Sequence, residues 1–180
     1  MTGPGAGPDR WRRVSTGQER TWFLAQLRPD LPLHNIARTV RILGCASPEV
    51  VERAVAVVMA RHEVLRTALA VHDGTVAGRV AESTAVGVRH TDLTRLPASA
   101  REPEFERIAA ADAAVPFALD RPPLLRVRRV RLGPDDQRLG YVVHAAVADV
   151  ASAAAIGAEL AGCVAALAAG QAPPGDPAPG

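Results

Sequence analysis

One stretch of the sequence joins a predicted strand to a predicted helix through a short loop that carries a histidine and an aspartate. The strand is expected to end at residues 141–144, with His144 as its last residue, and the helix is expected to begin near Ser152. Asp149 lies in the loop between them, five residues after His144. Because a strand and the helix that follows it must bury their apolar faces against a neighbouring layer, this stretch indicates a fold that mixes helices and strands.

The rest of the chain alternates in the same way. Ser15 and Gln18 have the spacing of a capping box, and Ser47 is followed by a proline at the first helical position. Further helices are therefore expected at residues 15–27, from 47 onward with the apolar stripe Val51, Val55 and Val58, and at 104–114. Strands are expected at residues 38–43, 66–71, 76–81, 86–90, 124–132 and 137–144. This mixture predicts an α/β fold, an α+β sandwich in which helices pack on a largely antiparallel sheet.

The loop stretch resembles the active-site motif of the condensation domains of nonribosomal peptide synthetases, which reads His-His-x-x-x-Asp-Gly. His144 and Asp149 match the first histidine and the aspartate. Ala145 replaces the second histidine, and Val150 replaces the glycine. The motif is therefore degenerate at two of its four fixed positions.

Two further segments carry the resemblance. Residues 61–67 match the family's Arg-His-Glu-x-Leu-Arg-Thr element at every fixed letter, and residues 15–24 keep five letters of its opening element, including Ser15, Gln18, Arg20 and Trp22. Weaker matches lie at residues 26–35, 116–119 and 123–126. All of these segments come in the family's order, and the resemblance covers residues 14–169.

The resemblance implies a chloramphenicol acetyltransferase-like lobe, the first of the two similar lobes in a condensation domain. The expected organisation is a disordered N-terminal arm over residues 1–13, the lobe over 14–169, and a Pro/Gly-rich tail over 170–180. The second lobe is expected to be absent from this chain.

For His144 two roles are open: it orients substrate, or it is a core histidine whose ring nitrogens bond to backbone. A carboxylate among apolar residues is costly unless it is paired. The resemblance implies that Asp149 is buried and paired with Arg61 or Arg66, since their motif packs beside this loop in the family. General acid–base work by Asp149 is the alternative. Ser152 is expected to be a helix N-cap rather than a nucleophile.

Ala145 argues against the reaction that the family performs. The family's second histidine acts as a base or positions the acceptor amine, and either role needs a ring nitrogen that a methyl group lacks. Val150 also argues against this reaction. Glycine permits a positive φ that a β-branched residue disfavours. The side chain of Val150 is also expected to narrow the channel in which the family's donor and acceptor substrates meet.

The intact motif Arg61, His62, Glu63 and Arg66 is expected to form a hydrogen-bonded corner between a helix and a strand; a catalytic cluster is the alternative. Trp22 and Phe23 are expected to be core anchors, and Glu19 and Arg20 to lie on a solvated face.

Other classes of site receive no support. The net charge of +2 is too small to indicate nucleic-acid binding, and the five histidines show no metal-ligand spacing. Cys45 and Cys163 are expected to be free thiols, and the alanine-rich segment after residue 150 is not expected to span a membrane. A cytoplasmic location follows, with no cofactor of the chain's own.

Three hypotheses about function follow. The first is a condensation-like half-domain that does not catalyse on its own and binds a peptidyl carrier protein, with its phosphopantetheine arm, or another synthetase-pathway protein. The second is one half of a split condensation or acyltransferase enzyme, completed by a partner chain that supplies the second lobe or by self-association. The third is a remnant without a function of its own.

Overall fold

The computed structural model describes residues 11–44, 46–82 and 86–175. Four α-helices lie in these ranges: α1 (Thr16–Leu27), α2 (Pro48–Arg61), α3 (Ala98–Ala113) and α4 (Val150–Ala168). The strands are β1 (Trp11–Arg13), β2 (Asn35–Leu43), β3 (Thr67–His72), β4 (Thr75–Val80), β5 (Arg89–Asp92), β6 (Leu125–Arg131) and β7 (Asp136–His144). A short 3-10 turn, Glu63–Arg66, joins α2 to β3.

The strands form two sheets, where the sequence predicted one. The first has the order β2-β7-β6-β5 and is antiparallel except for the parallel pair β5–β6, and the second is the antiparallel sheet β1-β4-β3. The turn at Asp73 and Gly74 takes positive φ angles and closes β3 and β4 into a hairpin, which pairs with β1 instead of joining the larger sheet. The fold class is otherwise as predicted, with helices packed on mostly antiparallel strands.

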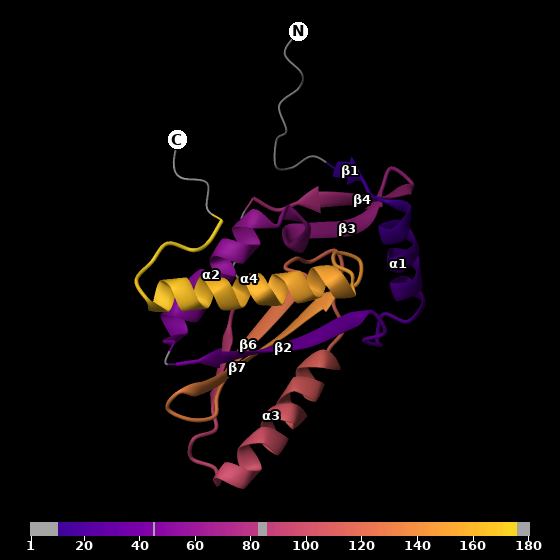
Figure 1. Cartoon of the computed structure of the whole chain (residues 1–180). Helices are drawn as coiled ribbons and strands as arrows, with labels where there is room; N and C mark the ends of the chain where they lie inside the picture. Colours follow the sequence, from indigo (N-terminus) through magenta and orange to yellow (C-terminus); the bar gives the residue numbers. More distant parts are fainter. Residues whose placement is uncertain (1–10, 45, 83–85, 176–180) are drawn as a thin grey trace.

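Helices cover both faces of the four-stranded sheet. In Figure 1, α4 and α2 lie on one side of β2, β7 and β6, and α3 lies on the other. Along β7 the side chains alternate between these two layers, as the period of a strand requires. Tyr141 faces α4, where its hydroxyl donates to the carbonyl of Ala153 at 2.7 Å, whereas Gly140 and Val142 line a pocket beneath α3.

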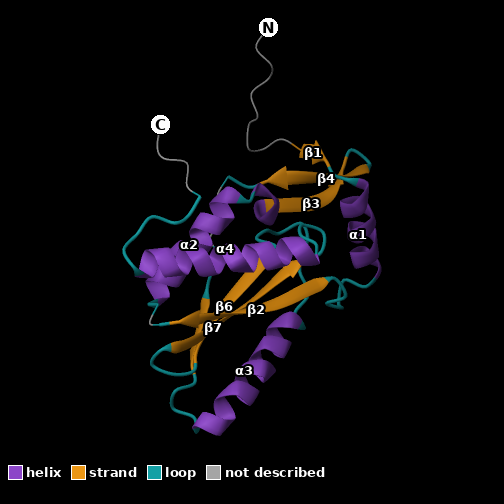
Figure 2. Cartoon of the chain, viewed as in Figure 1, coloured by secondary structure: helices purple, strands orange, loops and turns teal. Residues whose placement is uncertain are grey.

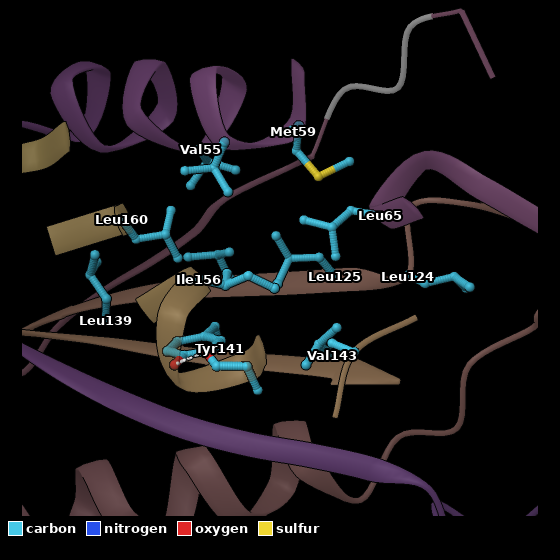
Figure 3. Packing of buried hydrophobic residues seen from close by; sticks show 14 of the residues in the cluster. Val55, Met59, Leu65, Leu124, Leu125, Leu139, Tyr141, Val143, Ile156 and Leu160 are labelled. Atoms are coloured by element: carbon cyan, nitrogen blue, oxygen red, sulfur yellow. Dashed lines mark hydrogen bonds between the residues drawn. The ribbon is translucent and has the colours of Figure 1, made fainter. Parts of the chain in front are cut away.

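The main core lies between the sheet, α2 and α4. Figure 3 shows side chains of α2, α4 and the strands meeting there, including Val55, Met59, Leu125, Tyr141, Val143, Ile156 and Leu160. The predicted stripe of Val51, Val55 and Val58 on α2 is buried, as are Ile156, Leu160 and Val164 of α4. By length and hydropathy, α4 is the one helix in the described ranges that could cross a bilayer, but in this fold it is a core helix.

Several predicted boundaries need correction. Residues 11–13 of the expected disordered arm form β1, because Trp11 stacks on His72 with a centroid distance of 4.9 Å and its backbone pairs with β4. Residues 1–10 of that arm lie outside the described residues. The helix expected at 104–114 begins at Ala98, ahead of Pro103, because Arg101 anchors its first turn by donating to the carbonyls of Leu96, Leu132 and Thr94.

Candidate functional site

His144 ends β7 and is buried, with 4% of its surface exposed. Its Nδ1 accepts a hydrogen bond from the backbone N–H of Ala146 at 3.1 Å. In the neutral ring, the proton must therefore lie on Nε2. This environment matches the second of the two roles left open for His144, a core histidine bonded to the backbone.

Burial, together with the smaller effects of the charges of His34 and Arg126, lowers the pKa of His144 from 6.5 to about 4. The ring is therefore uncharged at neutral pH. Because Nδ1 already accepts a hydrogen bond and Nε2 is protonated, this ring has no free lone pair with which to act as a general base.

His144 lines a pocket of about 410 Å³ between the end of α1 and the loop that follows α3. The ring of His34 approaches His144 edge-on at a centroid distance of 5.8 Å, and that of Phe117 does so at 6.0 Å. Neither neighbour was singled out from the sequence as a site residue. The signal was present, because both lie in segments that resemble the family, at residues 26–35 and 116–119.

Ala145 is the first residue after β7 and is half-buried. Its N–H donates to the carbonyl of His34 at 2.8 Å, which ties the motif loop to the start of β2. The three residues that follow are buried. The methyl group at the second histidine position therefore belongs to a loop that is held firmly at its backbone.

Asp149 corrects a prediction. It is exposed, it is the N-cap of α4, and its Oδ1 accepts from the N–H of Ser152 at 2.7 Å. This hydrogen bond holds the pKa of the Asp149 carboxyl below its usual range. The expected buried ion pair with Arg61 or Arg66 is wrong, because the unpaired N–H groups at the start of a helix satisfy the carboxylate at the surface. The expected capping role of Ser152 is also wrong, since the helix begins two residues before it.

Val150 stands at the glycine position of the motif. It is the first residue of α4 and is 58% exposed, and among the described non-glycine residues only Asp73 has a positive φ. The motif position therefore needs no glycine conformation in this chain. That its side chain narrows a channel stays a prediction.

The intact motif after α2 joins that helix to α4 through one carboxylate. Arg61 Nη1 donates to Glu159 Oε1 at 2.8 Å, and His62 Nε2 lies 2.5 Å from Glu159 Oε2. Burial raises the pKa of Glu159, but the hydrogen bonds from Arg61 and His62 outweigh burial and leave the pKa lowered. Sequence reasoning missed Glu159, although it is the only charged residue within α4.

Arg66 bonds to backbone rather than to a carboxylate. Its Nε donates to the carbonyl of Met59 at 2.9 Å, and its Nη1 donates to that of Ala81 at 2.5 Å, which joins the end of α2 to the residue after β4. Glu63 is exposed and lies 3.6 Å from Arg12. Arg61, His62 and Arg66 thus form a bonded corner, and Glu63 lies outside it.

The segment over residues 15–24 forms the start of α1 and attaches this helix to β3. Ser15 and Gln18 form the predicted capping box, with N–H···O distances of 3.2 and 3.0 Å. Trp22 Nε1 donates to the carbonyl of Leu69 at 3.1 Å, and Arg20 is exposed. Trp22 is half-buried against the main core. Phe23 was predicted to be a core anchor but is 54% exposed, because it points about 100° around the helix from Trp22.

Cys163 is buried, with its Sγ 3.9 Å from Arg61 Nη1, and Cys45 lies outside the described residues, so the prediction of two free thiols stays a prediction. Within the ranges that the structure describes, no group of three His, Cys, Asp or Glu side chains is arranged to hold a metal ion.

Comparison with known proteins places these features in a family. The family model described as "Condensation domain" matches residues 12–179. The chain is 37% identical over 136 residues to a linear gramicidin synthase of Brevibacillus parabrevis, and 38% identical over 136 residues to the phosphinothricin tripeptide synthetase PhsC of Streptomyces viridochromogenes. Both alignments cover 76% of this chain.

Solved structures agree with the sequence relatives. The first condensation domain of the CDA synthetase superposes with a TM-score of 0.82 at 25% identity over 92% of this chain. The starter condensation domain of the rhizomide synthetase RzmA superposes with a TM-score of 0.81 at 25% identity over 91%. This chain spans 42% and 39% of those solved chains, and 3% and 12% of the two relatives compared by sequence.

Proposed function

The chain belongs to the condensation-domain family of nonribosomal peptide synthetases, and from this premise we propose that it does not form peptide bonds on its own and acts through contacts with other proteins of its pathway. The partner is a peptidyl carrier protein, a tailoring enzyme or a synthetase module. One observation carries the proposal: Ala145 occupies the second histidine position of the motif. The rest of the scaffold, from the capping box to the corner at Arg61 and Arg66, is kept.

The electrostatics of His144 support the loss of catalysis. A general base needs a free lone pair and a pKa near the working pH. His144 uses its Nδ1 to accept from Ala146, and its pKa is lowered to about 4, so it does not replace the missing ring. A general base typically raises the rate of a reaction by about 10²- to 10⁴-fold. Without it, only the positioning of the substrates remains to accelerate the reaction.

The proposed setting is a cytoplasmic thiotemplate pathway. A linear gramicidin synthase and a phosphinothricin tripeptide synthetase are among its relatives, which supports this setting. In this setting the chain carries no cofactor of its own, and a carrier protein brings a phosphopantetheine arm to it.

A split enzyme is the second candidate, and the pocket of about 410 Å³ beside His34 and His144 favours it. A partner chain or a second copy that covered this pocket would enclose a channel. Acyl transfer would then depend on positioning, which can be worth several kcal/mol without a base.

Titration calorimetry with the carrier and tailoring proteins encoded beside this chain tests the proposal. We expect at least one of them to bind, and an equal affinity for the Ala145→Ser variant, which keeps a small side chain at the motif. If none of the pathway proteins binds, the proposed function fails. Copurification with a chain that supplies a second lobe, followed by product formation from loaded carrier proteins, would favour the split enzyme instead.

A further inference from the structure

The face of the four-stranded sheet that α3 covers contains a groove. It consists of two adjoining pockets of about 390 and 320 Å³ that share Asp112, Arg128, Gly140 and Val142 as lining residues. α3 lies across the sheet from α4 (Figure 2), and no residue of α4 lines this groove. One of its two pockets shares Pro116, Phe117 and Ala118 with the pocket that contains His144.

Small residues keep the groove open. Gly140 lies in the middle of β7, and no atom comes within 4 Å of the place that a Cβ would occupy there. On α3, Ala109, Ala110 and Ala113 line the facing wall. Larger apolar side chains, Phe105 and Ile108, line the same pocket further along α3. This end of the groove is therefore mostly apolar, although Arg38 and Thr39 of β2 also line it.

The other end of the groove carries three arginines and one carboxylate. Arg128 donates to both oxygens of Asp112, at 2.5 and 2.8 Å, and Arg89 Nη1 donates to the same group at 3.1 Å. Asp112 therefore serves two guanidinium groups at once. Arg126 lines the same pocket and stacks over Phe117 at 3.7 Å from the ring centroid.

Among the described residues no carboxylate is hydrogen-bonded to Arg126, although the charge of Asp112 partly offsets that of Arg89. Its Nη atoms donate to the carbonyls of Val115 and Pro116, and its buried Nε has no hydrogen-bond partner among the described residues. Burial lowers the pKa of Arg126, and the nearby charge of Arg89 lowers it further. A bound anion would relieve this repulsion.

We propose that the groove beneath α3 binds a small amphipathic carboxylate, with its anionic head between Arg89 and Arg126 and its apolar tail between α3 and β7. Arg89 is exposed and uses only Nη1 for Asp112, so Nε and Nη2 remain for a planar carboxylate, which matches the guanidinium fork. The tail lies along Phe105, Ile108 and Val142, in the space that Gly140 leaves empty.

Decanoate is the probe. Acetate, which has the carboxylate but no long tail, and decanol, which has the tail but no carboxylate, are the controls. Calorimetry on the whole chain should show binding of decanoate and at least tenfold weaker binding of either control, since a charge-assisted hydrogen bond contributes about a factor of ten or more. Inorganic phosphate tests whether the head group alone is recognised, and we expect it to bind no better than acetate.

Two variants separate the site from the fold. Gly140→Val places a side chain in the empty space, so it should abolish decanoate binding without lowering the thermal midpoint. Arg89→Gln should weaken decanoate binding about tenfold while Asp112 keeps its pair with Arg128. Gly133→Ala is the matched control, because its Cβ would meet only an ordinary contact at 3.8 Å outside the groove. Equal affinity for decanoate and acetate, or unchanged decanoate binding in Gly140→Val, would overturn the proposal.

Discussion

His144 and Asp149 come from one short motif, yet they occupy opposite environments. His144 is buried with its Nδ1 bonded to backbone, whereas Asp149 is exposed and caps α4. The sequence left two roles open for His144, and the arginine partner that was predicted for Asp149 is wrong. The partner of a carboxylate depends on where a helix begins to within one residue, and local patterns do not resolve that boundary.

Acidification should destabilise the protein through His144. Its folded pKa of about 4 lies below the ordinary 6.5, so between these pH values the unfolded chain binds a proton that the folded chain does not. The stability is fully present above pH 6.5 and falls as the pH drops toward 4, by about 2–3 kcal/mol. Urea unfolding at several pH values should show this loss in the wild type and a shallower slope in His144→Gln. Parallel profiles for the two proteins would contradict it.

Substitution of Asp149 distinguishes an N-cap from a buried ion pair. Asp149→Ala should cost about 1 kcal/mol of unfolding free energy, whereas loss of one partner from a buried pair costs about 3–5 kcal/mol. Asp149→Asn should be close to neutral, because asparagine caps helices as well as aspartate does. If both variants lost more than about 3 kcal/mol of unfolding free energy, Asp149 would have to form a buried ion pair rather than a helix N-cap.

At the scale of the elements, locally encoded features were predictable and long-range ones were not. The capping box at Ser15 and Gln18, the N-cap at Ser47 and the β6–β7 hairpin follow from a few neighbouring residues. The first turn of α3 was not predicted, and one of the bonds by which Arg101 fixes that turn is to the carbonyl of Leu132, far along the chain. The division into two sheets was missed for the same reason, since strand pairing depends on contacts between distant segments.

The junction of α2 and α4 should depend on Glu159. Its carboxylate serves Arg61 and His62 together, and both the arginine and the glutamate side chains are about four-fifths buried. Glu159→Gln should therefore lower the unfolding free energy by about 1.5–3 kcal/mol. Glu104→Gln, which breaks the exposed ion pair with Arg107, is the matched control and should cost less than about 1 kcal/mol. Equal effects of the two variants would show that the junction does not rely on this carboxylate.

For the whole molecule, the fold class and the family could be predicted because three motifs occur in order along most of the chain. The site could be predicted only in part: Ala145 and His144 were identified, whereas His34, Phe117 and Glu159 become neighbours only when the chain folds. The groove beneath α3 had no sequence signal, because an open glycine such as Gly140 cannot be recognised before its strand is paired.

The absence of a catalytic base is the central claim, and one measurement tests it most directly. The purified chain is incubated with its pathway's loaded donor and acceptor carrier proteins, and the condensed product is quantified by mass spectrometry against a reaction without the chain. We expect product at the level of the uncatalysed reaction, and the same level for His144→Ala. Product well above that level, lost in His144→Ala, would contradict the account, because it would show that the motif still performs the chemistry without its second histidine.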